Sequence, residues 1–314
     1  MTAERTGTVQ LTLAMVLSGT LGVFVVESTA SPSNVVFFRC VFGAVALAGY
    51  AAARGYFRDH GLTPAKLVLA ALGGVFIIFN WVFLFEAYES SSISLATVVY
   101  HTQPFFLVLL GAVVLRERLT GSQLGWLAAA FAGLVLVSGV RPGDAGSPAG
   151  IGLALLAALF YAASTLITKR VTGVRPHLIA LVQVLVGIPL LLPLTDLAET
   201  KGLGMGWVWL VGLGFIHTGL MYVLMYASYQ KLPTAKIAVL VFTYPAVAMV
   251  ADWAVYGHHI GVVQALGLPL IVAAGLKVTR GGAPRPAGPA GPASAEKQAG
   301  GKVQEPVEPV EEAR

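Results

Sequence analysis

Several polar side chains lie inside stretches of sequence that are otherwise apolar, and these residue types can do chemistry. Tyr100 and Gln103 are three positions apart in segment 93–115, so a helix places them on one side, with His101 beside them. A hydroxyl, an amide and an imidazole can hold a small polar solute, and histidine, with an unperturbed pKa of about 6.5, suits a proton-coupled step. The alternatives are a neutral packed histidine and polar groups that only tie this segment to a neighbour.

The same two interpretations apply to His217, which lies in another apolar segment. Aromatic and amide side chains elsewhere could wall a pocket for an amphipathic solute. The predicted binding residues are therefore Tyr100, His101, Gln103, Asn80, Trp81, Tyr161, His217, Tyr222 and Tyr244.

Charged residues at membrane depth are costly and are by default functional hypotheses. Arg39 and Glu86, together with Glu27, are expected to form an outer charge cluster. Pairing within it is favoured over capture of a substrate carboxylate, although an arginine can serve either purpose. Asp252 is a further outer acid. The candidates for proton or charge coupling are His101, His217, Glu86, Arg39 and Asp252.

Two prolines and one glutamate complete the candidate set. Pro104 and Pro245 each remove a backbone donor within an apolar segment, which predicts paired helix bends; a purely structural kink is the alternative. Glu117, between Arg116 and Arg118 in a loop, is expected to pair locally.

The elements that must position these residues follow from composition. Of the 314 residues 56% are hydrophobic and only 11% charged, against roughly 25% charged in soluble domains, so the chain is expected to be a membrane protein. Segments long enough to cross a bilayer are predicted at 9–27, 34–53, 66–86, 93–115, 121–140, 150–168, 177–195, 205–226, 234–256 and 261–278. They are apolar on every face, which excludes the alternating strands of a β-barrel.

The same arithmetic excludes several functions. Ten spans leave no room for a soluble catalytic domain, and no zinc, nucleotide-loop or paired intramembrane aspartate motif is present, so neither an enzyme nor a metal or cofactor is expected. The single cysteine, Cys40, excludes a disulfide framework. The net charge of +5 is scattered rather than gathered on a patch, which argues against nucleic acid as a partner.

Lysine and arginine occur mainly in alternate loops. Arg54, Arg58 and Lys66 follow the second span, whereas the loops of opposite parity hold Arg141 and Lys201. The positive-inside rule then predicts that both termini are cytoplasmic. Residues 1–8 are expected to form a short cytoplasmic tail, and 281–314, rich in Gly, Pro and Ala, a disordered one.

The chain also repeats itself. A shift of 141 residues superposes three polar or proline pairs: Thr102 on Thr243, Pro104 on Pro245 and Gln123 on Gln264. The halves, 9–140 and 150–280, hold five spans each, and because five is odd the second half must enter the membrane inverted. Inverted repeats recur in secondary transporters, whose substrate binds near the midplane between the halves. The predicted fold is thus an all-α integral membrane protein of ten transmembrane helices, built as two inverted five-helix repeats.

Specific residues extend this prediction to a family. The stretches 80–88 and 97–104, followed by Arg116-Glu117-Arg118-Leu119-Thr120 with Gln123 and Gly125, resemble the EamA-type repeat of the drug/metabolite transporter superfamily. In the second half the motif departs to Gly257-His258-His259-Ile260-Gly261. The resemblance implies a ten-helix carrier in a bacterial inner membrane that exports amino acids or other small organic metabolites. It also implies a central cavity lined by the first, third, fourth, sixth, eighth and ninth helices.

Two alternatives stay open. A translocase of an amphipathic lipid-linked or drug-like substrate would also fit an aromatic wall with Arg39. The small-residue spacing Gly125, Ala129 and Gly133 is expected to serve packing within the chain, with a homodimer interface as the second interpretation. The expected partners are a small-molecule substrate and the lipid bilayer.

Overall fold

The computed structural model describes residues 2–58, 60–91, 93–117, 119–139, 147–257 and 259–280. Within these ranges all regular secondary structure is helical. Nine helical segments there are long and apolar enough to cross a membrane, and a shorter apolar helix, Val262–Lys277, makes ten. The predicted disordered tail, 281–314, lies outside the described residues.

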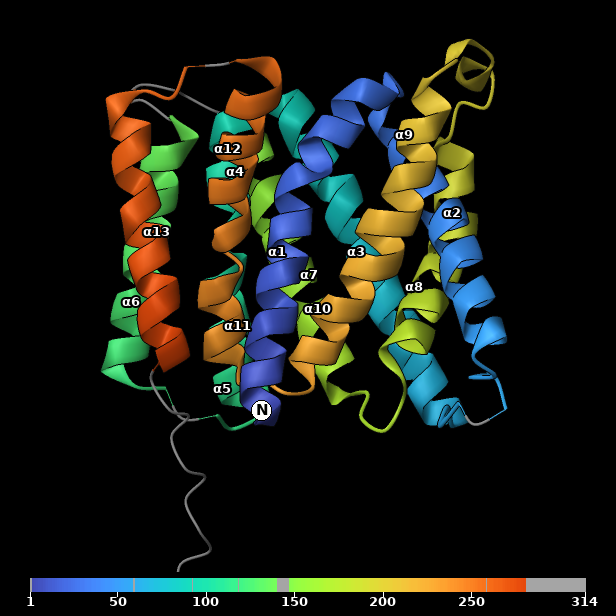
Figure 1. Ribbon diagram of the computed structural model, residues 1–314, viewed down its shortest axis with the longest axis horizontal. Helices are drawn as coiled ribbons and strands as arrows, with labels where there is room; N and C mark the ends of the chain where they lie inside the picture. Colours follow the sequence, from blue (N-terminus) through green and yellow to red (C-terminus); the bar gives the residue numbers. More distant parts are fainter. Residues whose placement is uncertain are drawn as a thin grey trace, which may run out of the picture. The chain divides into compact units, whose positions relative to one another are not determined.

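The first half of the bundle contains six helices that make five crossings (Figure 1). These are α1 (Ala3–Ser28), α2 (Pro32–Ala53), α3 (Pro64–Ser90), α4 (Ile93–Tyr100), α5 (Gln103–Val114) and α6 (Gly121–Ser138), and α4 and α5 share one crossing.

The second half follows the same plan with more interruptions. It comprises α7 (Pro148–Arg170), α8 (Pro176–Leu191), the short η1 (Leu192–Leu194) and η2 (Glu199–Gly202), α9 (Gly206–Gly212), η3 (Leu213–Leu220), α10 (Met221–Tyr229), α11 (Thr234–Leu240), α12 (Thr243–Tyr256) and α13 (Val262–Arg280). η3 is a π-helix, and α9, η3 and α10 form one crossing.

The first helix is longer than predicted. It begins at Ala3 instead of residue 9, because the Thr2 hydroxyl accepts a hydrogen bond from the Arg5 amide and caps the first turn. Most of the expected short tail, residues 3–8, is helical in the structure.

Two crossings are broken at equivalent points. One break, at His101 and Thr102, separates α4 from α5, and the other, at Val241 and Phe242, separates α11 from α12. Pro104 and Pro245 follow within the first turn of α5 and α12, where a missing backbone donor costs least. The breaks are one repeat length apart.

The main contacts between a helix of the first half and a helix of the second half have counterparts formed by the two equivalent helices of the opposite halves. α2 packs against η3 as α8 packs against α3, and α1 packs against α12 as α7 packs against α4 and α5. α6 and α13 pack against each other at one side of the bundle (Figure 1). This exchange is the pattern that an inverted repeat requires.

Glycines let these helices approach closely. A Cβ atom on Gly133 of α6 would lie 2.8 Å from the carbonyl oxygen of Gly267 in α13. A Cβ on Gly187 of α8 would lie 2.8 Å from the sulfur of Cys40 in α2. At Gly133 the neighbouring atom belongs to the backbone, which gives way less easily than the side chains of Cys40 and Ile78 that face Gly187.

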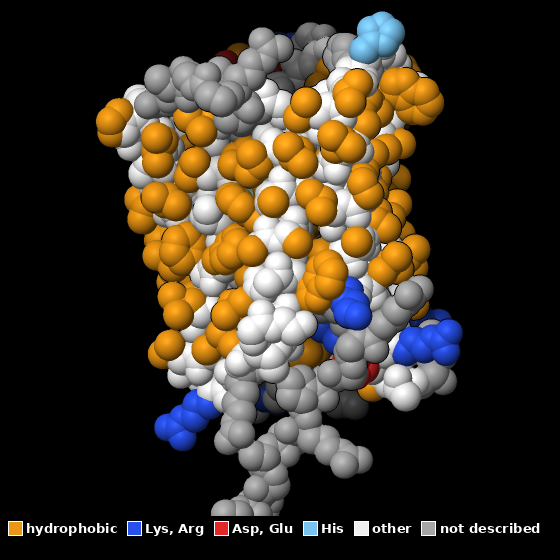
Figure 2. All heavy atoms as spheres, turned by 90° about the vertical axis from the view of Figure 1, so that its left-hand side faces the viewer, with side chains coloured by type: hydrophobic (Ala, Val, Ile, Leu, Met, Phe, Trp, Pro, Cys, Tyr) orange, Lys and Arg blue, Asp and Glu red, His pale blue; other side chains and the backbone are white. Residues whose placement is uncertain are grey.

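The outside of the bundle is apolar. Figure 2 shows hydrophobic side chains over the face that carries α6 and α13, with lysine and arginine near the end where the N-terminus lies. On α13 and α5, Val262 and Val113 are 80% and 71% exposed. Such a surface is stable in lipid and not in water, so the chain is a multi-pass membrane protein.

Candidate functional site

The break between α4 and α5 brings several predicted residues together inside the bundle. The rings of His101 and Tyr244 lie 5.1 Å apart, and those of Tyr100 and Tyr161 6.3 Å apart. Asn80 of α3 is fully buried and donates from Nδ2 to the carbonyl of Ala157 in α7 at 2.8 Å. We name these residues, together with Gln103, which begins α5 two residues after His101, the central group; its polar side chains, Asn80, His101 and Gln103, are at most 2% exposed.

The central group contains polar atoms that the described protein leaves without a hydrogen-bond partner. They are Asn80 Oδ1, His101 Nε2 and Gln103 Oε1. An unsatisfied buried polar atom costs free energy, on the order of 1–3 kcal/mol, so folded proteins usually avoid it. Three such acceptors make the central group the candidate site for a molecule that could supply the donors.

The geometry fixes the tautomer of His101. Its Nδ1 lies 2.6 Å from the carbonyl oxygen of Thr97, which can only accept, so Nδ1 carries the proton. Nε2 of the neutral ring is then a free acceptor, able to bind a donor group or to take up a proton.

A row of tyrosines connects the central group with the interior of the second half. Tyr222 and Tyr226 have ring centroids 5.4 Å apart, Tyr226 and Tyr229 5.8 Å, and the Tyr229 hydroxyl lies 3.4 Å from that of Tyr161. The Tyr226 hydroxyl donates to Gln183, whose amide donates to Thr168 at 3.0 Å. Tyr161 and Tyr222, which the sequence offered as walls of a pocket, both belong to this row.

A second buried group surrounds Arg39 of α2. Arg39 is 6% exposed, donates from Nε to the Thr218 hydroxyl at 3.4 Å, and lies 5.1 Å from the centre of the Trp81 ring. The Tyr222 hydroxyl lies beside the guanidinium. His217, next to Thr218, contacts the Thr20 hydroxyl through Nε2 at 3.0 Å.

The expected outer charge cluster is wrong as far as the structure describes its members. Two ion pairs occur among the described residues, and neither contains Arg39. Glu27 accepts from the Tyr256 hydroxyl at 3.1 Å, and Glu86 is exposed. Helix α3 turns Glu86 outward, whereas it turns Trp81, five residues earlier, toward Arg39.

Asp252 is half-buried on α12 and interacts electrostatically with Tyr256, one turn away. Tyr256, the last residue of α12, also donates to Glu27. Neither of these contacts involves the central group or Arg39.

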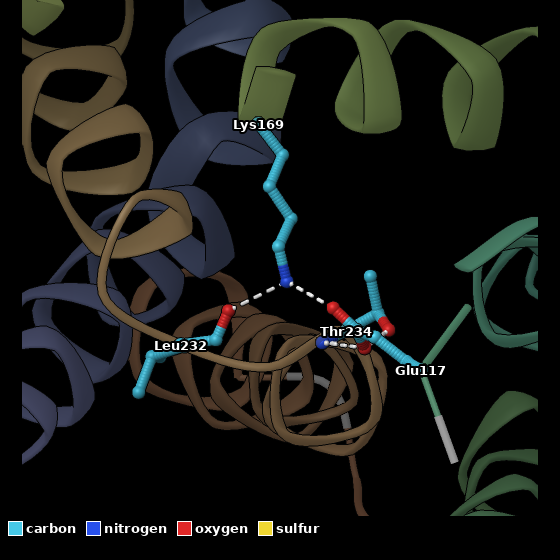
Figure 3. A network of polar contacts seen from close by, with 4 residues as sticks. All are labelled: Glu117, Lys169, Leu232 and Thr234. Atoms are coloured by element: carbon cyan, nitrogen blue, oxygen red, sulfur yellow. Dashed lines mark hydrogen bonds and ion pairs between the residues drawn. The ribbon is translucent and has the colours of Figure 1, made fainter. Parts of the chain in front are cut away.

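Glu117 joins the two halves at the end of the bundle where the N-terminus lies (Figures 1 and 3). Its Oε1 lies 2.7 Å from Lys169 Nζ, and its Oε2 accepts from the backbone amide of Thr234 at 2.9 Å and from the Thr234 hydroxyl. Lys169 also donates to the carbonyl of Leu232 at 2.9 Å. The expected local pairing is thus wrong: Glu117 caps α11, far away in sequence.

The environment of Glu117 shifts its titration. Burial alone would raise the pKa of this carboxyl, but hydrogen bonds from Lys169 and Thr234 and the lysine charge outweigh burial and lower the pKa from its usual value. Further contacts reinforce this end of the bundle: Lys236 pairs with Glu4 at 2.6 Å, and Lys231 donates to Gln10 at 2.7 Å.

Sequence reasoning missed Thr218 and Gln183, whose signal was a polar group within an apolar segment. It also missed Lys169 and Thr234, which lie in loop-proximal positions where polar residues are unremarkable. No cluster of three or more potential metal ligands occurs among the described residues; His258, of the His258-His259 pair, lies outside them.

Ten apolar helices, two inverted halves and buried polar groups where the halves meet define a class of protein, the multi-pass membrane transporters of the inverted-repeat type. The EamA-like transporter family model matches residues 5–139 and 148–279, one match to each half. The chain belongs to this family, and it is a transporter, not an enzyme.

Comparison with individual proteins gives the same family and fold. The uncharacterized transporter YxxF of Bacillus subtilis is 32% identical over 274 residues, covering 86% of this chain and 88% of the relative. A riboflavin transporter of Rhizobium johnstonii is 34% identical over 132 residues, 42% of this chain and 40% of that protein. A solved crystal structure superposes with a TM-score of 0.77 at 21% identity, covering 87% of this chain and 96% of the other, which shows the fold alone.

Proposed function

We propose that this transporter exports small organic metabolites, such as amino acids, from a bacterial cytoplasm by alternating access. The observation that carries the proposal is the central group, in which Asn80, His101 and Gln103 each keep a buried acceptor without a partner. A solute with amino or amide donors would satisfy them, and the rings of Tyr100, Tyr161 and Tyr244 would cover its apolar part.

The two broken helices support alternating access. Each half contributes one break, and each lies beside the central group, since His101 occupies the first and Tyr244 follows the second. Small rotations at these points would open the site to one side and close it to the other. Glu117 and Lys236 would separate from their partners when the end near the N-terminus opens.

Proton exchange would drive the export. His101 has one free nitrogen, and His217 has a ring nitrogen, Nδ1, without a partner. His101 Nε2 and His217 Nδ1 are buried, whereas Glu86 is exposed and Asp252 half-buried, so the imidazoles are the preferred proton carriers in this proposal. A protonated His101 would turn an acceptor into a donor and so weaken binding of a substrate amino group.

Orientation and assembly belong to the same proposal. The protein would lie in the inner membrane. The lysine and arginine residues at the end of the bundle that carries the N-terminus support a cytoplasmic location for this end. A homodimer remains a second state to test, but Gly133 is occupied by α13 of its own chain, which leaves only the Gly125 part of that face for a partner.

The test is uptake of radiolabelled amino acids into inside-out vesicles, with and without a pH gradient, by the wild type, His101→Ala and Tyr100→Ala. Riboflavin joins the panel because one partial relative carries that name. The proposal predicts gradient-dependent uptake that falls about tenfold or more in both variants, the equivalent of losing about 1.4 kcal/mol of binding.

His177→Ala is the matched control, since His177 stacks on Tyr50 at 4.8 Å, apart from both groups. Uptake that survives in His101→Ala and Tyr100→Ala would remove the site from α4. Uptake only in the opposite vesicle orientation would replace export by import.

A further inference from the structure

We infer that Arg39 is the anion-binding residue of the transported solute, so that the substrate carries a carboxylate. This inference rests on the proposed function and names the substrate class within it. It begins with charge: Arg39 is only 6% exposed, and the described residues provide its guanidinium with hydroxyls and a ring but no carboxylate. A buried charge is stable only when an opposite charge or a dense set of acceptors compensates it.

The contacts of Arg39 leave most of its donors available. A guanidinium has five N–H groups in a planar fork, and the structure gives Arg39 hydrogen bonds to two hydroxyls, those of Thr218 and Tyr222. The planar fork matches the two oxygens of a carboxylate. Trp81 lies within 5.1 Å and Tyr222 beside it, so a bound acid would have an aromatic surface next to the charge.

The other half of the molecule shows that the fold does not need a charge here. Arg39 is seven residues after Pro32, the first residue of α2, and Gln183 is seven residues after Pro176, the first residue of α8. These helices are equivalent in the inverted repeat, and counting from their first residues pairs them with a shift of 144 instead of the 141 that relates the later helices. Gln183 is 1% exposed and satisfied by Tyr226 and Thr168, so a neutral amide fills this position when packing is its only task.

Position favours an encounter with the solute. Arg39 lies about 10 Å along α2 from Pro32, at 1.5 Å per residue, inside the span. Trp81 is adjacent in sequence to Asn80 of the central group. The row of tyrosines also links the two groups, since it runs from Tyr222, beside the guanidinium, to Tyr161, beside Tyr100.

The experiment uses the purified full chain and has two arms. In the first, the unfolding temperatures of ligand-free wild type and Arg39→Gln are compared. The Arg39→Gln change removes an uncompensated charge and introduces the residue found at the equivalent position, Gln183. We expect it to raise the unfolding temperature by about 2 °C or more. A lower temperature would mean that Arg39 has a structural partner and would overturn the inference.

In the second arm, phenylacetate and N-acetylphenylalanine are compared with their neutral amides as stabilising ligands. We expect the acids to bind wild type at least about tenfold more tightly than the amides, and Arg39→Gln to lose this preference. Arg39→Lys should keep a reduced preference, because it retains the charge without the fork. Arg54→Gln, which removes an exposed arginine at the end of the same helix, is the control and should behave as wild type.

The arms separate the inference from the proposed function. Acid-selective binding that depends on Arg39, without uptake of any amino acid or riboflavin, would contradict export and keep Arg39 as an anion site. Uptake with equal binding of acids and amides, or with neither form bound, would keep the transporter and overturn the role of Arg39.

Discussion

At the scale of single residues, the buried charges are of two kinds: Glu117 and Lys169 form an ion pair, whereas Arg39 has no oppositely charged partner among the described residues. Glu117 and Lys169 are 24% and 14% exposed and share their hydrogen bonds with Thr234 and Leu232. Arg39 is more deeply buried and, in the part of the chain that the structure describes, has no carboxylate partner. The first arrangement stabilises the fold, and the second is the one for which we propose a role in binding.

Glu117→Gln is therefore expected to destabilise the protein. The amide keeps the volume but loses the charge that Lys169 and the start of α11 require, at a cost of about 1–3 kcal/mol, more than an exposed pair would give. Thermal unfolding in detergent measures it. Glu86→Gln, at an exposed site, should unfold at the wild-type temperature; equal effects of both would show that the contacts of Glu117 contribute nothing.

The lowered pKa of Glu117 gives this effect a pH dependence. As pH falls, the unfolded chain takes up the proton first, so the stabilisation is complete above the ordinary glutamate pKa of about 4.3 and is lost as pH falls through the lower folded pKa. The difference in unfolding temperature between wild type and Glu117→Gln should be constant from about pH 7 to pH 5 and shrink below about pH 4. A difference that disappears near neutral pH would contradict the assignment.

At the scale of elements, the interrupted crossings are where the molecule departs from a simple bundle. A continuous helix satisfies every backbone group in lipid, so a break persists only where the surroundings compensate it. Both breaks lie inside the protein, next to buried side chains such as His101 and Phe242. They are the elements able to change shape without exposing backbone to lipid.

Pro104→Ala tests this role. Alanine restores the missing donor and favours a continuous helix, so the unfolding temperature should stay level or rise while transport slows about tenfold, the equivalent of about 1.4 kcal/mol of barrier. Pro189→Ala, within the uninterrupted α8, is the control and should transport at the wild-type rate. Unchanged transport by Pro104→Ala would assign the break to packing alone.

The contact between α6 and α13 makes a second element-scale prediction. Gly133→Ala places a Cβ 2.8 Å from a carbonyl oxygen of α13 and should cost about 1–3 kcal/mol of stability. Gly125→Ala, on the same helix, meets nothing within 4 Å and should be neutral or slightly stabilising. Equal unfolding temperatures for the two variants would show that the helices do not pack through Gly133.

At the scale of the whole molecule, the sequence was sufficient for the fold and only partly sufficient for the site. Long apolar segments and the 141-residue shift predicted the ten helices and the inverted plan, because membrane spans are set by local composition. The contacts of Glu117 and Arg39 could not be predicted this way, since their partners, Lys169, Thr234 and Thr218, come from the other half. Long-range pairs depend on how helices rotate against each other.

Topology is the property of the whole molecule that is simplest to measure. Cysteines introduced as Arg58→Cys and Lys201→Cys lie at opposite ends of the bundle. In intact cells an impermeant maleimide should label Lys201→Cys and spare Arg58→Cys until the membrane is opened, because basic loops stay in the cytoplasm. The reverse pattern would invert the protein and the direction of the proposed transport.

The close packing of Cys40 against Gly187 makes such labelling experiments simpler. The thiol is fully buried between α2 and α8, and it is the one cysteine in the chain. Alkylating reagents need an accessible thiolate, so the natural protein should remain unlabelled. Spin labels and fluorophores can then be attached to one half or the other without first removing a native reactive group, and the distance changes of the working cycle can be followed in an otherwise unaltered molecule.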